Sequence, residues 1–459
     1  MNRSLRTLVA VTLAAFVSLT AASSRADEPA PAPTDLRSSP LTEWRVVAIA
    51  AREAPSVMAS HKAAEAAEAE RTAVDRSRLP DLVVTGRYTR LSSIPSRYRN
   101  LAVPFPDGSE ASFAIPQVLD SYAARAAVVV PLSDAWLGLA ASARALGHVA
   151  TAKRIELDAA RARAAYEARA AFLLYRRASV ARRIAETALE VASAQAKDQD
   201  DRVRAGTAPG SSALTFEAAK NAAVARLRVA EAEVATAEAN VRVFLPSSLA
   251  TEPLVLGEDG RAPLPRSGIE RSPELRAAEA AVVAADARVE AETLSMLPRL
   301  SLVAGAEVSA PHPRAFAVDH LVGVPSWDVT LQLDWALSSV TTGTARRERA
   351  TAEREALRAR AEEVRRALEA QRASAAAARA SAEARIATGN ASVATATKLA
   401  ETRRRELHAG AATPLDVTNA EAERVRAELE RADAELDARL ADARLAYAAG
   451  YVPRSDGGR

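Results

Sequence analysis

The sequence has no cysteine among its 459 residues. Disulfide bridges, thiolate metal sites and cysteine nucleophiles are therefore all excluded. Aromatic residues are also scarce, at 4% of the chain, while alanine is abundant and charged residues run through long stretches without glycine or proline. Such a composition is typical of long helices packed through small side chains, and it argues against two or three ordinary globular domains.

Motifs of catalysis and of cofactor binding are missing as well. No Walker loop or GxGxxG follows a predicted strand, and no pair of nucleophile and base can be recognised. Metal-ligand spacing is not found among the five histidines, His61, His148, His312, His320 and His408. We expect no enzyme, no catalytic residue, no cofactor and no bound metal, and we interpret the histidines as surface side chains.

A secretory signal peptide is predicted at residues 1–26. Arg3 and Arg6 precede an apolar stretch from Leu8 to Ala22, and Ser24-Arg25-Ala26 offers a small-x-small cleavage site. The apolar stretch is too short for a membrane span, although an N-terminal anchor is the alternative interpretation. Residues 1–26 hold three arginines and no acid, so the mature chain has 58 basic and 58 acidic residues. This balance, without a basic block interleaved with aromatics, argues against nucleic acid as a partner.

The chain consists of two copies of one pattern. Leu79-Pro80-Asp81-Leu82 recurs as Leu297-Pro298-Arg299-Leu300, and Arg204-Ala205-Gly206 recurs as His408-Ala409-Gly410. Such internal similarity predicts a duplicated fold. We divide the chain into a first repeat at 27–245, a Pro/Gly-rich linker at 246–272, a second repeat at 273–450 and a short tail at 451–459.

Two proline-free segments predict unusually long helices, at residues 135–205 and 344–409. As α-helices they would span about 106 and about 99 Å, which only a coiled coil or an extended bundle can accommodate. In the first segment alanines recur at steps of three and four, a seam that lets neighbouring helices approach closely. Shorter helices that would stack in pairs beside the long ones are predicted at 42–79, where Pro55 kinks or delays the helix, and at 211–245, 273–297 and 414–450.

Four segments alternate apolar and polar residues with a period of two: 81–91, 121–132, 299–309 and 326–337. Strands of this length, apolar on one face, suit a transmembrane barrel with a wet lumen, whereas a soluble half-buried sheet would give the same alternation. Tyr88, Trp136, Trp327 and Trp335 favour the barrel, as aromatics of the membrane interface. Even small barrels need eight strands, and open strand edges cannot exist in lipid, so a barrel requires several copies of the chain.

The order helix, strand, strand, long helix, helix, repeated behind a signal peptide, resembles the TolC-like outer membrane efflux proteins. Leu79-Pro80-Asp81 and Leu297-Pro298-Arg299 are similar to the residues that begin the family's barrel strands, and Val130-Pro131-Leu132 to those that end them. Gly410, followed by Asp416-Val417, is similar to the family's periplasmic tip. The resemblance covers about residues 40–450, and Ala336 departs from it by standing where a second barrel-end proline is expected.

The resemblance implies a mostly α fold with a small β part, in which a duplicated long-helix barrel joins four transmembrane strands per protomer. Three protomers would form one twelve-stranded barrel in the outer membrane and a tunnel that extends into the periplasm. The function would be that of an outer-membrane channel subunit in a tripartite efflux or type I secretion system. Its partners would be its own copies in a homotrimer, a periplasmic adaptor protein, an inner-membrane pump or ABC transporter, and outer-membrane lipid.

Two other classes of protein remain as alternatives. A periplasmic coiled-coil scaffold would use the same helices but would not need four alternating strands. A periplasmic adaptor protein would have one helical hairpin flanked by small β domains, not two copies with full-length helices.

At the second tip, the resemblance implies an inward-pointing carboxylate at Asp416, with Asn419 where a second acid is expected. A threefold ring of Asp416 would gather cations and oppose its own ionisation. The alternative is an ordinary acid in the first turn of a helix. Likewise, Arg403-Arg404-Arg405 could latch a closed tip, but basic residues are expected in a last helical turn.

The two tip turns are expected to be structural. Gly206 and Gly410 end the long helices, where the left-handed conformation is usually needed. With Pro414 they would also shape the surface that an adaptor contacts. The first turn, Gly206 to Ser212, is about two residues longer than the second and has no matching aspartate.

Overall fold

The computed structural model describes residues 41–93, 95, 100–114, 119–249, 251–257, 268–312 and 323–450. The predicted signal peptide and the predicted tail lie outside these residues. The chain divides into two compact units, residues 1–41 and a second unit that begins at Thr42. The elements described below all belong to the second unit.

This unit is mostly helical with a small sheet, so the predicted fold class is confirmed. Its helices are α2 (Glu43–Glu53), α3 (Pro55–Arg76), α4 (Gly138–Arg204), α5 (Gly210–Arg242), α6 (Pro273–Leu294), α7 (Ser338–His408) and α8 (Pro414–Ala448). Short 3-10 turns lie at Ser247–Leu249 and Ile269–Arg271. Pro55 is the first residue of α3, and the interruption expected there separates α3 from α2.

The helix α7 begins six residues before the start predicted from the sequence. The predicted segment starts at Thr344, directly after Gly343, and glycine disfavours a helix interior. In the structure Gly343 lies inside α7, and a Cβ at this position would collide with the side chain of Met296 at the end of α6. The close packing of the two helices therefore overrides the local preference.

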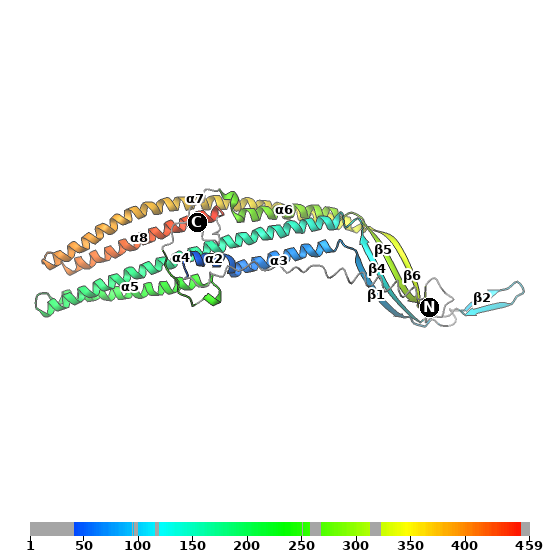
Figure 1. Cartoon of the computed structure of the whole chain (residues 1–459), viewed down its shortest axis with the longest axis horizontal. Helices are drawn as coiled ribbons and strands as arrows, with labels where there is room; N and C mark the ends of the chain where they lie inside the picture. Colours follow the sequence, from blue (N-terminus) through cyan, green and yellow to red (C-terminus); the bar gives the residue numbers. More distant parts are fainter. Residues whose placement is uncertain are drawn as a thin grey trace. The chain divides into compact units, whose positions relative to one another are not determined.

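The helices pack side by side in a definite order (Figure 1). α4 packs against α3 and α5 on one side and against α6 and α8 on the other, and α7 packs against α6 and α8. Because α3 and α5 follow each other along α4, and α6 and α8 along α7, two short helices accompany each long one. The order across the layer is therefore α3/α5, α4, α6/α8 and α7.

The strands continue this order. β1 (Asp81–Arg90), β4 (Asp120–Pro131), β5 (Arg299–Ala310) and β6 (Val324–Asp334) form one sheet in the order β1-β4-β5-β6, and all neighbours are antiparallel. The strands β1, β4, β5 and β6 are connected in sequence to α3, α4, α6 and α7. Helices and strands thus have the same two outer members, α3 with β1 and α7 with β6.

Two details of the strand prediction were wrong. The segment between β1 and β4, where no strand was predicted, contains the hairpin of β2 (Asn100–Pro104) and β3 (Glu110–Ala114). Its turn is closed by Gly108 at φ 80° and by Asp107 Oδ1, which accepts from the amide of Ser109 at 3.0 Å. The last strand was predicted to extend to residue 337, but β6 ends at Asp334, so Trp335 to Leu337 lie outside it.

The buried core is built mainly from alanine. On α7 the buried residues Leu368, Ala375 and Ala382 recur every seven residues, which is the spacing of a helix-packing seam. Larger buried side chains are few, and include Phe172 on α4 and Phe216 on α5. No helix in the described ranges combines the length and the apolarity needed to cross a bilayer.

Candidate functional site

The register of the four-stranded sheet brings the four predicted apolar rows together on one face. Val84 lies opposite Ala126, Ala126 opposite Ala306, and Ala306 opposite Trp327. The next row along the strands contains Thr85, Arg125, Glu307 and Ser326, whose side chains belong to the other face. One face of the sheet is therefore apolar across all four strands, and the other face carries the polar and charged side chains, with small and β-branched residues between them.

The apolar face is uncovered in the single chain. The side chains of Val84 and Trp327 are 72% and 77% exposed, and Leu331 and Leu333 on β6 are exposed as well. A contiguous apolar sheet face of this kind marks contact with a protein partner or with a membrane. In addition, β1 and β6 form the two outer edges of this sheet. Both the apolar face and the two edges therefore require partners.

Polar side chains border the apolar face where the sheet meets the β1–β4 connection. The Tyr88 hydroxyl donates to Asp120 Oδ1 at 2.7 Å, and Arg90 Nη1 donates to the same oxygen at 2.9 Å. A tyrosine with an apolar ring and a hydrogen-bonded hydroxyl suits the border between lipid and water.

At the other end of the unit, both tip turns have the geometry predicted for them. Gly206 and Gly410 each have φ 73°, the left-handed conformation that glycine adopts without strain. The amide of Thr207 donates to Arg202 O at 2.9 Å, and the amide of Ala411 donates to Glu406 O at 2.8 Å. These are the bonds of a Schellman motif, which satisfies carbonyls that the ending helix leaves open.

The start of α8 gives Asp416 a structural role. Asp416 Oδ2 accepts from the amide of Thr413 at 2.8 Å and from its hydroxyl at 2.6 Å, and the Asp416 amide donates to Thr413 Oγ1 at 3.2 Å. Together with Pro414 at the first helical position, this is a capping box. The hydrogen bonds from the Thr413 side chain and backbone lower the pKa of the Asp416 carboxyl.

The first tip is held differently. α5 begins at Gly210, after Pro209, and has no side-chain cap of this kind. Instead the Ser212 hydroxyl donates to Pro209 O at 2.6 Å, and Gln199 Nε2 of α4 donates to Ser212 Oγ at 2.7 Å. Gln199 and Ser212 are both buried. This pair could not be predicted from the sequence, because a glutamine near the end of a helix has no distinctive signal.

Near the tips, contacts join the α4–α5 hairpin to the α7–α8 hairpin. Ala196, Phe216 and Val417 form a buried apolar cluster against Leu407. Arg202 of α4 contacts His408 at the end of α7. These contacts come from three or more helices, so no local sequence pattern could have predicted them.

Glu421 of α8 is the centre of a polar bridge that the sequence analysis also missed. It is paired with Arg404 of α7 and with Arg424 at 3.0 Å, and it accepts from Gln195 of α4 at 3.5 Å. Arg403 pairs with Glu406 at 2.8 Å, one turn along the same helix. The arginines considered as a latch are thus engaged within the chain, and of the three only Arg405 lies in the last turn of α7.

Asn419 lines a groove between α4, α5 and α8. The groove has a volume of about 590 Å³ and is lined also by Leu214, Leu415 and Thr418. Leu214 and Leu415 are exposed, at the starts of α5 and α8. Asn419 therefore lies in a groove between the two hairpins that has both apolar and charged lining residues, whereas Asp416, one turn earlier on α8, is not part of the lining.

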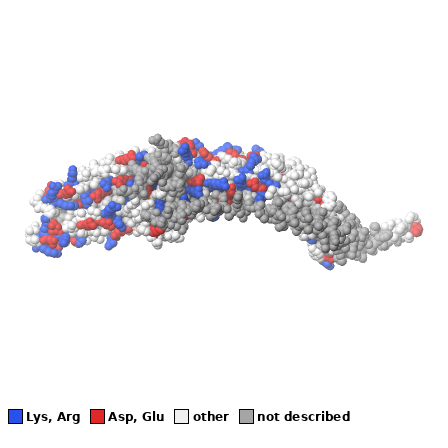
Figure 2. Space-filling view, in the orientation of Figure 1, with Lys and Arg blue, Asp and Glu red and all other residues white. Residues whose placement is uncertain are grey.

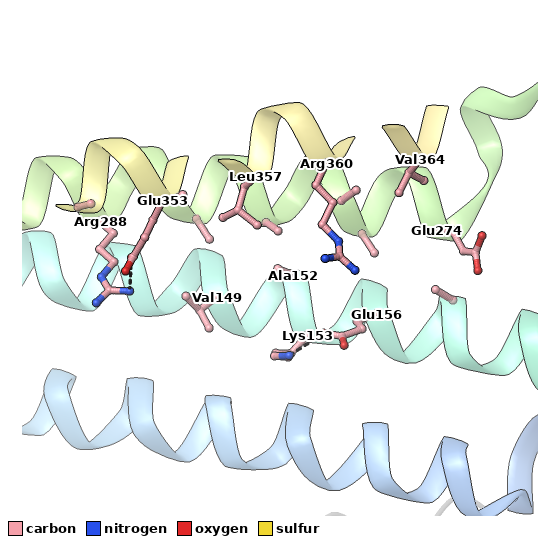
Figure 3. Close-up of a pocket in the computed structure, with 17 residues that line it drawn as sticks. Val149, Ala152, Lys153, Glu156, Glu274, Arg288, Glu353, Leu357, Arg360 and Val364 are labelled. Atoms are coloured by element: carbon pink, nitrogen blue, oxygen red, sulfur yellow. Dashed lines mark hydrogen bonds and ion pairs between the residues drawn. The ribbon is translucent and has the colours of Figure 1, made fainter. Parts of the chain in front are cut away.

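A second groove of about 550 Å³ lies over α6, between α4 and α7 (Figure 3). Its floor is mostly alanine, and its charged lining residues are three basic and three acidic ones: Lys153, Arg288, Arg360, Glu156, Glu274 and Glu353. Arg288 pairs with Glu353 at 3.3 Å, and Lys153 with Glu156 at 2.7 Å. The lining of this groove has no excess of positive or negative charge, and Figure 2 shows the same interspersed charges along the helices.

The histidines give no metal site in the described ranges, where no group of three or more ligand-type side chains comes together. His61 lies beside Glu65 at 3.2 Å on the surface of α3. His312, expected on the surface, is only 9% exposed, two residues after the end of β5. His320 lies outside the described residues.

Comparison with known proteins gives a consistent result. Residues 264–451 match the family model of the outer membrane efflux proteins. No curated protein matches the chain in sequence. Among solved structures, the chain is similar to a membrane protein from Pseudomonas aeruginosa, with 19% identity, a TM-score of 0.74, and coverage of 89% of this chain and 93% of that one.

Two further structures are similar over comparable lengths. The CmeC outer membrane channel of Campylobacter jejuni has 12% identity and a TM-score of 0.73, over 88% of this chain and 85% of that one. The MtrE outer membrane channel of Neisseria gonorrhoeae in its open state has 17% identity and a TM-score of 0.69, over 89% and 88%. At these identities the similarity is one of fold. The resemblance seen in the sequence is confirmed: residues 264–451 match the family model of the outer membrane efflux proteins, and the described chain has the fold of the solved outer-membrane channels.

Proposed function

We propose that this chain is the outer-membrane channel subunit of a tripartite efflux system, and that it works as a homotrimer. The observation that carries the proposal is that the layer of helices and the sheet have their outermost members on the same two sides. α3 and α5 with β1 form one edge, and α7 with β6 forms the other. A single ring interface would close both layers at once.

The duplication predicts what each open edge needs. α4 lies between α3/α5 and α6/α8, whereas within the described residues its counterpart α7 packs mainly against α6/α8. The α3/α5 pair of the next copy would complete the surroundings of α7, and β1 of that copy would pair with β6. Because the four strands alternate in direction, this pairing is again antiparallel. Three copies give twelve strands, which closes the sheet and removes every edge from lipid.

Small residues line the open edge of α7. Exposed alanines recur at steps of three and four on the side of α7 that faces away from Leu368 and Ala375: Ala370, Ala373, Ala377, Ala380, Ala384, Ala387 and Ala391. On α5, exposed alanines recur every seven residues on the side away from the buried Phe216 and Ala223: Ala218, Ala225, Ala232 and Ala239. Two such rows allow helices to approach at the close end of the usual 8–10 Å.

In this assembly the apolar face of the sheet contacts outer-membrane lipid and the polar face lines the pore. The helices extend into the periplasm, and residues 1–26 serve as the export signal. Gly206, Gly410 and Pro414 shape the tip turns that contact a periplasmic adaptor protein, which links the channel to an inner-membrane pump or ABC transporter. Asp416, with Asn419 one turn later, lies at the narrow end of the pore. The role is that of a conduit, without a catalytic step.

The mass of the purified protein in detergent tests the assembly. We expect a trimer with intact strand content, and a stable folded monomer would disprove the channel. Labelling on intact cells tests the orientation, because the β2–β3 turn would face outside. A cysteine at Ser109 should react with an impermeant maleimide, with the cysteine-free wild type as the blank. Labelling only after rupture of the outer membrane would reverse the topology.

A further inference from the structure

Three charged side chains meet on the polar face of the sheet. Arg125 of β4 donates from Nη2 to Asp328 Oδ2 of β6 at 2.8 Å, and its Nη1 lies 3.5 Å from Glu307 Oε2 of β5. One guanidinium therefore holds two carboxylates from two neighbouring strands. All three side chains are about one third exposed, as expected on a wet face.

A glycine makes this arrangement possible. To reach Asp328, the Arg125 side chain crosses β5 at Gly305, which lies directly opposite Asp328. A Cβ at Gly305 would lie 2.7 Å from Arg125 Nη2 and 2.9 Å from its Cζ, so any side chain would displace the guanidinium. Gly305 does not have the positive φ of the turn glycines. Since glycine weakens a strand interior, its contribution here is the space it leaves.

The same two carboxylates would bind a metal cation if the arginine were absent. Glu307 and Asp328 are diagonal neighbours on adjacent strands, within reach of one another. Thr330 Oγ1 lies 3.5 Å from Asp328 Oδ2 and adds a third oxygen. Two carboxylates and a hydroxyl are ligands that Ca²⁺ and Mg²⁺ accept.

We propose that Arg125 determines the ion specificity of the barrel, as a resident cation that occupies the place of a divalent ion between Glu307 and Asp328. The proposal rests on the channel function above, in which this face lines the pore. By neutralising one carboxylate and engaging both, Arg125 prevents the pore wall from retaining divalent cations that enter from the loop side of the sheet.

Single-channel recording with Ca²⁺ added on the loop side tests this, in an Asp416→Ala background so that the tip does not contribute. The parent should conduct equally with and without millimolar Ca²⁺. Arg125→Ala should be blocked by Ca²⁺ at a concentration at least about tenfold below the millimolar level that the parent tolerates. A tenfold difference corresponds to about 1.4 kcal/mol of added Ca²⁺ binding free energy. Arg125→Lys, which keeps a cation, should stay insensitive. Adding Glu307→Gln and Asp328→Asn to Arg125→Ala should restore insensitivity.

Arg87→Ala is the matched control, because it removes an arginine of the same face on β1. An equal Ca²⁺ block in Arg87→Ala would mean that general charge, not the Arg125 position, sets the response, and would overturn the proposal. So would an Arg125→Ala channel that Ca²⁺ leaves unblocked. A wild type that carries no ion current would instead disprove the channel function itself.

Gly305→Ala gives a second test that keeps every charge, in case Arg125→Ala fails to assemble. Its methyl group would displace the guanidinium from Asp328, so calorimetric titration of the trimer with CaCl₂ should show binding that the parent lacks. Absence of binding in an assembled Gly305→Ala trimer would contradict the proposal.

Discussion

α4 and α7 are the corresponding long helices of the two repeats, yet they differ in their surroundings. α4 has helices on both sides and buries large residues such as Phe172 and Leu173. Within the described residues α7 packs mainly against α6 and α8, on one side, and its few buried residues include Leu368 and a series of alanines. Because the duplication gives both helices the same internal partners, the difference shows what α7 lacks. It lacks the neighbour that α4 receives from the other repeat.

The largest effect should come from a charge in the open row of α7. Ala377→Glu would bury an unpaired carboxylate between copies, at a cost of several kcal/mol, and should abolish the trimer. The measurement is the mass of the detergent-solubilised protein. Thr187→Glu, at an exposed position of α4, is the control and should leave assembly intact. An Ala377→Glu trimer of normal stability would place the interface elsewhere. The difference between the surroundings of α4 and α7 would then say nothing about assembly.

The two faces of β6 allow a second test with adjacent positions. Leu331→Arg would put a cation on the apolar face, which should destabilise the folded state in lipid by about 2–4 kcal/mol near the membrane midplane. Thr330→Arg puts the same side chain on the polar face and should cost far less. Denaturant titrations of the protein refolded into vesicles measure both. Equal losses from the two variants would argue for a soluble sheet, without lipid on one face.

How far the sequence alone predicts this molecule depends on the range of the signal. Period-two alternation indicated the strands and their apolar faces, and the register then aligned four rows that the sequence could only describe one at a time. Proline-free stretches located the long helices to within a few residues, and the largest difference is at the start of α7, which begins six residues before the predicted segment. Local rules worked where local bonds decide the structure.

The contacts between hairpins could not be predicted in the same way. Glu421 is one of many glutamates on helices, and its bridge to Arg404 and Gln195 depends on how α4, α7 and α8 pack. The β2–β3 hairpin was missed for a different reason. Its strands are short, and Pro104 with Pro106 reads as a loop, whereas the Asp107–Ser109 bonds close a turn.

The tip glycines compare the two repeats at a smaller scale. Gly206→Ala and Gly410→Ala would each force a side chain into φ 73°, at a cost of about 1 kcal/mol. Gly210→Ala is the control, because it lies in the first turn of α5 with no positive φ and open space around it, and should not destabilise. Thermal unfolding of the three variants measures this. A loss at Gly206 but not at Gly410 would show that the capping box at the second tip compensates for the strained turn.

The smallest effect on stability, and the sharpest question, concerns Asp416, which only the second tip has. In the chain its pKa is lowered by the Thr413 hydrogen bonds, so its contribution to stability is present above the unfolded pKa and is lost as the pH falls through the lower folded value. A threefold ring would act in the opposite direction, because neighbouring carboxylates raise one another's pKa.

Divalent or trivalent cations added from the periplasmic side of a planar bilayer should reduce the wild-type conductance, and protonation of Asp416 should relieve that block. If the ring dominates, lowering the pH relieves the block while the pH is still above the range in which an ordinary aspartate titrates. If the cap dominates, the block persists until the pH has fallen below that range. Asp416→Ala should abolish the block and leave the trimer intact, while Asn419→Ala, one turn along α8, should keep the block. A block that is unchanged in Asp416→Ala would leave Asp416 as the capping residue of α8 and place the constriction elsewhere.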